Sequence, residues 1–260
     1  MSQPRALRLT SASAATDAAW LAAADVATIA AGLCVDYRLI GGIAITLLVH
    51  HHQVDHLVPA RETADADLGV GFDVLSDDAL PEALRRAGYS AEESNRFARD
   101  DDHGRRRVID VLAPSYLGRL LTNQSHGAIV VDEVPGLAEA LHLAPVRVSV
   151  TAALTDATDV DVTLHLPDAR AALILKAYAY RGRWSHRDAL DIWRLLEAAS
   201  QAGHRAADWP PGLGARDAAQ ILHEFFAAPA ATGPKAATRD PSAQARIRAL
   251  VHQVVPPPTP

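Results

Sequence analysis

The chain of 260 residues contains a single cysteine, Cys34, so it cannot form a disulfide within itself. This lack of cross-links is typical of a protein that works in a reducing compartment. No uninterrupted apolar run of about 18 residues is present, and the first residues lack the basic segment and compact apolar stretch of a signal peptide. These absences predict a cytoplasmic protein that is not embedded in a membrane.

Several common enzyme motifs are also missing. The sequence has no Gly-x-x-x-x-Gly-Lys-Ser/Thr phosphate loop, no Gly-x-Gly-x-x-Gly dinucleotide turn and no Gly-x-Ser-x-Gly nucleophile turn. These absences argue against the enzyme classes that depend on those motifs. The formal net charge of −6 argues against nonspecific coating of nucleic acid, although a local basic patch can still contact phosphates.

The spacing of apolar residues predicts two different halves. The first half alternates helices and short strands, and we expect strands at 37–40, 65–74, 107–112, 128–131, 146–152 and 160–166 and helices at 17–33, 43–57 and 77–86. After Asp168 the pattern is helical, with helices at 171–180, 186–199, 215–226 and 243–254. We therefore predict an α/β domain over 17–167, a helical domain over 168–255, a linker at 228–241 and tails at 1–16 and 256–260, the first of them weakly ordered. A ligand cleft between the halves is expected.

Three aspartates on the predicted strands indicate chemistry. Asp65 and Asp67 point to the same side of a strand, because side chains alternate along it, and their carboxylates repel each other unless a cation lies between them. Asp110 interrupts an apolar strand, where a charge is costly unless it is paired or binds an ion. Three converging carboxylates suit magnesium. The alternative for the Asp-x-Asp pair is a solvated strand edge.

Upstream, Gly41 and Gly42 stand between a predicted strand and a predicted helix. Such a turn lets the backbone approach a phosphate closely, and it directs the amides of the helix N-terminus toward an anion. A tight turn with no ligand is the alternative.

Taken together, these motifs resemble those of the polymerase-beta-like nucleotidyltransferases, and in particular of the AbiEii-type toxins, which include the MenT toxins. The segment Gly41-Gly42-Ile43-Ala44 is similar to the glycine turn of that family. Arg61-Glu62-Thr63-Ala64-Asp65-Ala66-Asp67-Leu68 is similar to its Arg-x-Thr-x-Asp-x-Asp-Leu block, and Asp110 resembles its third strand carboxylate.

A second block, at 175–193, makes the resemblance specific to the toxin-like branch. It contains Lys176, Arg183, Arg187, Asp188 and Asp191, which are similar to the family's lysine, arginine and Asp-x-x-Asp pair. Lys176 and Arg183 are seven residues apart, so both can meet phosphate from one face of a continuous helix. An Asp–Lys pair across two helices would fix Lys176, so Asp191 is as plausible a positioning residue as a catalytic one. A purely structural salt-bridge network remains the alternative.

The resemblance implies an α+β fold, with the mixed sheet of the polymerase-beta-like nucleotidyltransferases flanked by helices and followed by a helical C-terminal half. It implies magnesium-dependent transfer of a nucleoside monophosphate from an NTP to a hydroxyl, with the tRNA 3′ end as acceptor and an antitoxin protein as partner. The expected cofactor is Mg²⁺, as two ions, with Mn²⁺ as a possible substitute. The expected residues are Asp65, Asp67 and Asp110 for metal and catalysis, Lys176 and Asp191 for catalysis, and Gly41, Gly42, Arg61, Thr63, Lys176 and Arg183 for the nucleotide.

Other readings stay open from the sequence. The acceptor could be a protein or a small hydroxylated compound such as an antibiotic, or the chain could be a nucleotide-binding module without turnover. His52 and His56 stand one helical turn apart, but no third ligand for zinc is evident, and the cluster of His50 to His52 with His56 has no assigned role. The run Arg105 to Arg107, near Arg96 and Arg99, suits either a nucleic-acid backbone or a mixed-charge surface loop.

Overall fold

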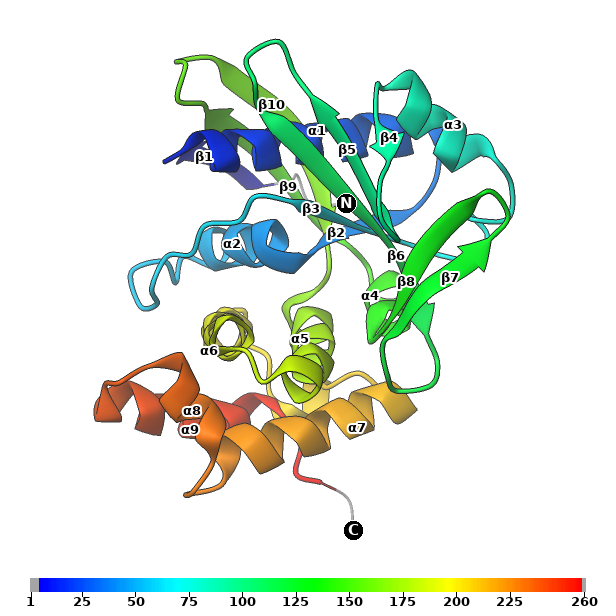
Figure 1. The fold of residues 1–260 in the computed structure, drawn as a ribbon. Helices are drawn as coiled ribbons and strands as arrows, with labels where there is room; N and C mark the ends of the chain where they lie inside the picture. Colours follow the sequence, from blue (N-terminus) through cyan, green and yellow to red (C-terminus); the bar gives the residue numbers. More distant parts are fainter. Residues whose placement is uncertain (1–4, 259–260) are drawn as a thin grey trace.

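The computed structural model describes residues 5–258 and shows a mixed α+β fold with two sheets packed above a helical half (Figure 1). The expected fold class is confirmed. The larger sheet contains β2 (Tyr37–Ile40), β3 (Ala66–Val70), β4 (Ser90–Ala91), β5 (Arg96–Asp100), β6 (Arg106–Ser115), β7 (Leu121–His126) and β8 (Ile129–Pro135). The smaller sheet has the order β1 (Arg5–Thr10), β9 (Val146–Ala153), β10 (Asp159–Leu166).

The helices of the first half are α1 (Ala14–Leu33), α2 (Gly41–His51), α3 (Ala79–Arg86) and α4 (Leu137–His142). The second half contains α5 (Ala169–Arg183), α6 (His186–Gln201), a 3-10 turn (Ala206–Asp208), α7 (Leu213–Leu222), a π-helical turn (His223–Ala227), α8 (Thr232–Ala237) and α9 (Pro241–Val254). Short polar side chains start several helices, because they accept a backbone N–H that the first turn leaves free. Ser13, Asp168, Ser185 and Asp240 cap α1, α5, α6 and α9 in this way.

Strand β6 organises the larger sheet because it pairs with three neighbours. Strand β3 runs parallel to one edge of β6, while β5 and β8 share the other edge, β5 antiparallel along the first part and β8 parallel along the last. In this register Asp67 lies opposite Asp110, and Asp110 lies opposite Arg96. Three charged side chains from distant parts of the sequence thus form one row across the sheet.

The core lies between the sheets and the helices that cover them. Alanines of α1, such as Ala22 and Ala23, are fully buried and allow close approach of the helix to the sheets, and Leu47 and Leu48 of α2 are buried as well. Helix α2 packs on α6, so the first half and the helical half share one continuous core. The division into domains at 17–167 and 168–255 stays a prediction.

Several expected element boundaries are wrong. Residues 5–16 are not a weakly ordered tail: Arg5–Thr10 is a strand that pairs in parallel with β9, and α1 begins at Ala14. Leu7 and Leu9 pack against the core, which supplies the burial that a tail would lack. The expected linker at 228–241 contains α8. Residues 1–4 and 259–260 of the expected tails lie outside the described residues.

Strands β4, β5 and β7 and helix α4 are additional to the sequence-based expectation, because they are short and their sequences are polar or mixed. In residues 5–258, no helix combines the length and the apolar character needed to cross a lipid bilayer.

Candidate active site

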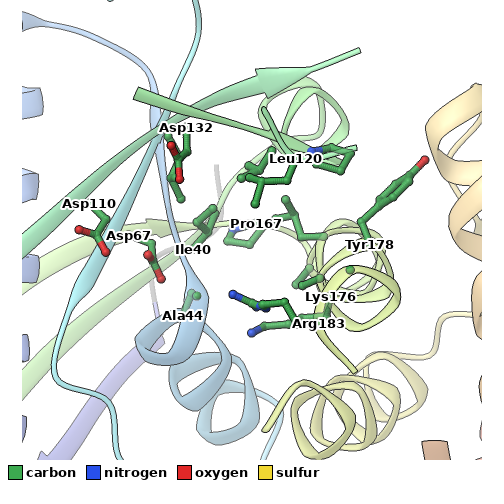
Figure 2. A pocket seen from close by; sticks show the side chains of 18 of the residues that line it. Ile40, Ala44, Asp67, Asp110, Leu120, Asp132, Pro167, Lys176, Tyr178 and Arg183 are labelled. Atoms are coloured by element: carbon green, nitrogen blue, oxygen red, sulfur yellow. The ribbon is translucent and has the colours of Figure 1, made fainter. Parts of the chain in front are cut away.

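A cavity of about 580 Å³ lies between the larger sheet and helix α5 (Figure 2). The sheet supplies one wall, and α5 supplies the opposite one. Its lining combines charged groups with an apolar surface; the charged side chains include Asp67, Arg96, Asp110, Asp132, Lys176 and Arg183, and the apolar ones include Ile40, Leu112, Leu120, Val134, Pro167 and Leu175. This mixture suits a ligand that carries both charge and an apolar ring.

Asp67 is the carboxylate at the centre of the sheet wall. Its pKa is raised to about 7, first because burial disfavours the charged form and then because Asp65 and Asp110 repel it. Lys176 and Arg183 act in the opposite direction from across the cavity, and Figure 2 shows both side chains pointing toward Asp67. Among residues 5–258, no group donates a hydrogen bond to the Asp67 carboxylate, which therefore faces the cavity with free oxygen atoms.

The glycine pair leaves room for the side chains of Asp67 and Thr63. Gly41 begins α2 with a φ of +71°, and a Cβ atom there would lie 1.6 Å from Oδ2 of Asp67. A Cβ atom on Gly42 would lie 2.7 Å from the hydroxyl oxygen of Thr63. Gly41 lines the cavity, whereas Gly42 is not part of the lining. The sequence predicts that the backbone at Gly41 and Gly42 approaches a phosphate closely. In the structure this backbone lies close to the side chains of Asp67 and Thr63.

The three expected metal ligands are only partly brought together. Asp110 lies beside Asp67, but both of its oxygens accept hydrogen bonds from Arg96, at 2.9 and 2.8 Å. Asp65 accepts one from the Thr63 hydroxyl at 3.0 Å and, like Thr63, lies outside the cavity lining. Within residues 5–258, no three His, Cys, Asp or Glu side chains are grouped closely enough to hold a metal ion. The carboxylates repel one another, so Asp110 and Asp65 turn to local donors instead.

A divalent cation nevertheless fits the chemistry of these donors. Carboxylate oxygens are the ligands that magnesium prefers, and Asp67 presents such oxygens to the cavity without a hydrogen-bond partner among the described residues. A cation placed there would relieve the repulsion that raises the pKa of Asp67. Asp110 would join it only after releasing Arg96.

Lys176 is held by the predicted Asp–Lys contact across two helices. Its Nζ lies 3.0 Å from Oδ1 of Asp188 and 2.9 Å from Oδ2 of Asp191. Asp191 is fully buried and is also contacted by Arg61 at 2.9 Å and Arg194 at 3.4 Å. Neither Arg61 nor Asp191 lines the cavity. In this geometry Asp191 anchors Lys176 from outside the lining, and Arg61 in turn binds Asp191.

Arg183, about two turns beyond Lys176 on α5, completes the basic wall. Its Nε and Nη2 donate to the carboxylate of Asp188 at 3.1 and 2.9 Å. Its side chain is 62% exposed, so the guanidinium can still meet a ligand. Asp188 therefore orients both basic groups, and its own pKa is lowered by Lys176 and Arg183 despite its burial.

Two lining residues were missed at the sequence level. Arg96 was grouped with a surface run of arginines, and its role follows only from the pairing of β5 with β6. Asp132 belongs to no motif, although it interrupts the apolar strand Ile129–Pro135 just as Asp110 interrupts its own strand. A charge within an apolar strand is the sequence signal that identifies Asp132, as it does Asp110.

The other clusters form structural contacts. Arg105 and Arg107 both donate to Asp101, at 2.8 and 3.2 Å, and Arg106 pairs with Glu92, which favours the mixed-charge surface reading. His50 to His52 cap the end of α2, and the pKa of His52 is lowered to about 4, mainly by burial. These histidines and His56 are not part of a metal-binding group within the described residues.

Comparison with known families agrees with this geometry. The model of the family described as "Nucleotidyl transferase AbiEii toxin, Type IV TA system" matches residues 28–253. The chain belongs to this family. It is therefore a nucleotidyltransferase of the AbiEii toxin family, and the resemblance noted in its motifs is confirmed. The matched range includes both the glycine–aspartate block and the Lys176 block.

A solved structure has the same fold with little sequence similarity to this chain. The crystal structure of an antigenic nucleotidyltransferase-like protein from Paracoccidioides brasiliensis aligns with a TM-score of 0.51 at 14% identity, covering 93% of this chain and 95% of that one. A search of curated protein sequences gave no match.

Proposed function

We propose that this AbiEii-family nucleotidyltransferase moves a nucleoside monophosphate from an NTP to the 3′ hydroxyl of tRNA, with magnesium as cofactor. One observation carries the proposal: Asp67 faces Lys176 and Arg183 across a single cavity (Figure 2). A triphosphate between these walls would meet positive charge on one side and, through a cation, carboxylates on the other.

In this proposal the basic wall holds the leaving group. Lys176 and Arg183 contact the β- and γ-phosphates, and the charge that develops on pyrophosphate is neutralised there. Asp188 keeps the side chains of Lys176 and Arg183 in place, since its carboxylate contacts both. Asp191 also contacts Lys176. Asp191 is a positioning residue on this view, because it is fully buried behind Lys176.

On the opposite wall, Asp67 and Asp110 would hold the magnesium ions, and Asp65, outside the lining, would join them after releasing Thr63. When bound, such ions lower the pKa of the attacking hydroxyl and stabilise charge at the α-phosphate. The acceptor hydroxyl releases its proton to solvent, and its oxygen forms a bond to the α-phosphorus. The bond from that phosphorus to the oxygen that bridges the α- and β-phosphates breaks, and pyrophosphate leaves. Gly41 keeps Asp67 accessible at this point, because any larger residue would occupy the place of its carboxylate.

The acceptor and the partner rest on the family. AbiEii proteins are described as toxins of type IV toxin–antitoxin systems, so an antitoxin protein is the proposed partner. Addition of nucleotides to the tRNA 3′ end would block aminoacylation and halt growth. A cytoplasmic location belongs to the same proposal.

The test is transfer from each α-labelled NTP, with magnesium, to separated pools of total tRNA, protein and small metabolites. We expect label in tRNA, and Asp67→Asn should reduce it at least about 100-fold because it removes a central carboxylate charge. Asp73→Asn is the matched control, because Asp73 is exposed and lies outside the cavity lining. Label only in protein or in a small molecule would refute the tRNA acceptor, and no transfer to any pool would refute the proposed reaction.

A further inference from the structure

The cavity contains a carboxylate that the proposed reaction does not use. Asp132 lies on β8, opposite Leu112 of β6, and lines the same wall as Asp67 and Asp110 (Figure 2). We propose that Asp132 accepts a hydrogen bond from a ribose hydroxyl of the incoming nucleotide, and thereby selects ribonucleotides over 2′-deoxyribonucleotides. This inference rests on the proposed function, because it assigns the part of the nucleotide that the same cavity holds.

One oxygen of Asp132 is fixed from two sides. Its Oδ1 accepts a hydrogen bond from the Ser94 hydroxyl at 3.1 Å and another from the backbone N–H of Asn123 at 2.9 Å. Ser94 precedes β5, and Asn123 lies at an irregular point in the pairing of β7 with β8. Both residues have a φ of 57°, in the left-handed region, which asparagine adopts more readily than serine. Two segments that are separate in the sequence therefore hold this carboxylate.

The other oxygen is free for a ligand. Within the described part of the chain, 5–258, nothing donates a hydrogen bond to Oδ2 of Asp132. An ionised carboxylate only accepts hydrogen bonds, so its ligand must present a donor. The phosphates of an NTP are acceptors and are repelled by Asp132, which leaves the nucleoside part of the molecule.

The register of the sheet separates Asp132 from the other two carboxylates of the cavity wall. Neighbouring strands are about 4.8 Å apart and residues rise about 3.3 Å. From the pairs Asp67 with Asp110 and Leu112 with Asp132, the Cα atom of Asp132 lies about 8 Å from that of Asp110 and about 12 Å from that of Asp67. Asp132 therefore lies along the wall from the two carboxylates that are proposed to serve the phosphates.

The lining also offers an apolar surface. Leu120, Val134 and Pro167 belong to it and suit the face of a base. The sugar connects the base to the phosphates, so it lies between this apolar surface and the basic wall. In this arrangement its hydroxyl groups would be the donors offered to Oδ2 of Asp132.

The test measures binding without transfer. Isothermal titration of ATP, CTP, GTP and UTP and of their 2′-deoxy counterparts, with magnesium and without an acceptor, gives the ribose preference of the wild-type protein. We expect each ribonucleotide that binds to do so about 10-fold more tightly than its deoxy form. Asp132→Asn should lower that ratio to about 2–3-fold, because a neutral amide bonds the hydroxyl more weakly than the charged Oδ2 does, while the amide oxygen still accepts from Ser94 and Asn123.

Controls separate selection from folding. Asp159→Asn makes the same change of charge on the smaller sheet, where Asp159 is paired with Arg8, and should leave the ratio unchanged. Asp132→Asn should keep the melting temperature within about 2 °C of wild type, and if it does not, Asp132→Glu gives a second variant that retains an accepting group and should keep the preference. Equal weakening of both sugars by Asp132→Asn, a loss confined to one base, or a wild type without ribose preference would each overturn the proposal.

The two proposals can fail separately. Ribose selection that depends on Asp132, without transfer of label to tRNA, would refute the proposed acceptor and leave this inference standing. Transfer to tRNA by Asp132→Asn with unchanged ribose preference would refute only the role of Asp132. Absence of NTP binding by the wild type would refute both.

Discussion

Asp191 shows how a side chain can determine a site without lining it. It is fully buried, and Lys176, Arg61 and Arg194 all contact its carboxylate. Removal of one partner from a buried ion network leaves the other charges desolvated and unpaired, which is strongly destabilising. The residue therefore couples the position of Lys176 to the stability of the helical half.

At this position we predict that Asp191→Asn lowers the free energy of unfolding by about 3 kcal/mol. Denaturation in urea measures this change. Asp217→Asn is the control, because Asp217 forms a partly exposed pair with Arg181 and should lose no more than about 0.5 kcal/mol. If Asp191 only anchors Lys176, the cost of Asp191→Asn should shrink when Lys176 is replaced by Met, and strict additivity of the two changes would contradict the anchoring role.

At the scale of elements, the turn between β2 and α2 decides whether the carboxylate strand can fit. We predict that Gly41→Ala reduces nucleotide transfer at least about 100-fold and destabilises the protein by more than 1 kcal/mol, because the added methyl group occupies the place of the Asp67 carboxylate. Labelled-nucleotide transfer and thermal unfolding measure the two effects.

A second glycine separates strain from collision. Gly203 also has a positive φ, of 85°, but a Cβ atom there would meet nothing within 4 Å. Gly203→Ala should therefore cost about 1 kcal/mol in stability and leave transfer near the wild-type level. Equal loss of transfer in both variants would mean that the contact between Gly41 and Asp67 is not responsible.

The elements also show what the sequence could and could not predict. Asp67, Gly41 and Lys176 were found because local spacing and family motifs place them on a strand, a turn and a helix. Arg96 and Asp132 were not selected, because their position depends on which strands pair with β6 and in what register. The strand Arg5–Thr10 was missed for the same reason, since its partner β9 begins at Val146. Long-range pairing leaves little trace in a single sequence.

At the scale of the whole molecule, the histidines at the end of α2 link stability to pH. The pKa of His52 is lowered from 6.5 to about 4, first by burial and then by the positive charge of neighbouring groups. The folded protein thus resists a proton that the unfolded chain accepts between pH 6.5 and 4. The contribution of neutral His52 is fully present above pH 6.5 and is lost as the pH falls through that range.

We predict that His52→Gln makes the fall in unfolding free energy between pH 6.5 and 4 smaller by about 1–3 kcal/mol. Urea denaturation across this pH range measures the slope. His56→Gln, a change at an exposed position nearby, should leave the slope close to that of the wild type. A slope that is unchanged in His52→Gln would show that other groups cause the acid sensitivity.

The cavity draws its two walls from distant parts of the chain: its carboxylates lie between Asp67 and Asp132, and Lys176 and Arg183 of the facing wall follow only in α5. During synthesis, the nascent chain lacks the basic wall of the cavity until α5 has left the ribosome, so it is inactive until then. Any premature stop codon before Lys176 would likewise yield a harmless fragment. Selection for cells that survive this toxin should therefore recover truncating mutations along most of its gene, whereas survivors with full-length protein should have substitutions concentrated at the few residues described above.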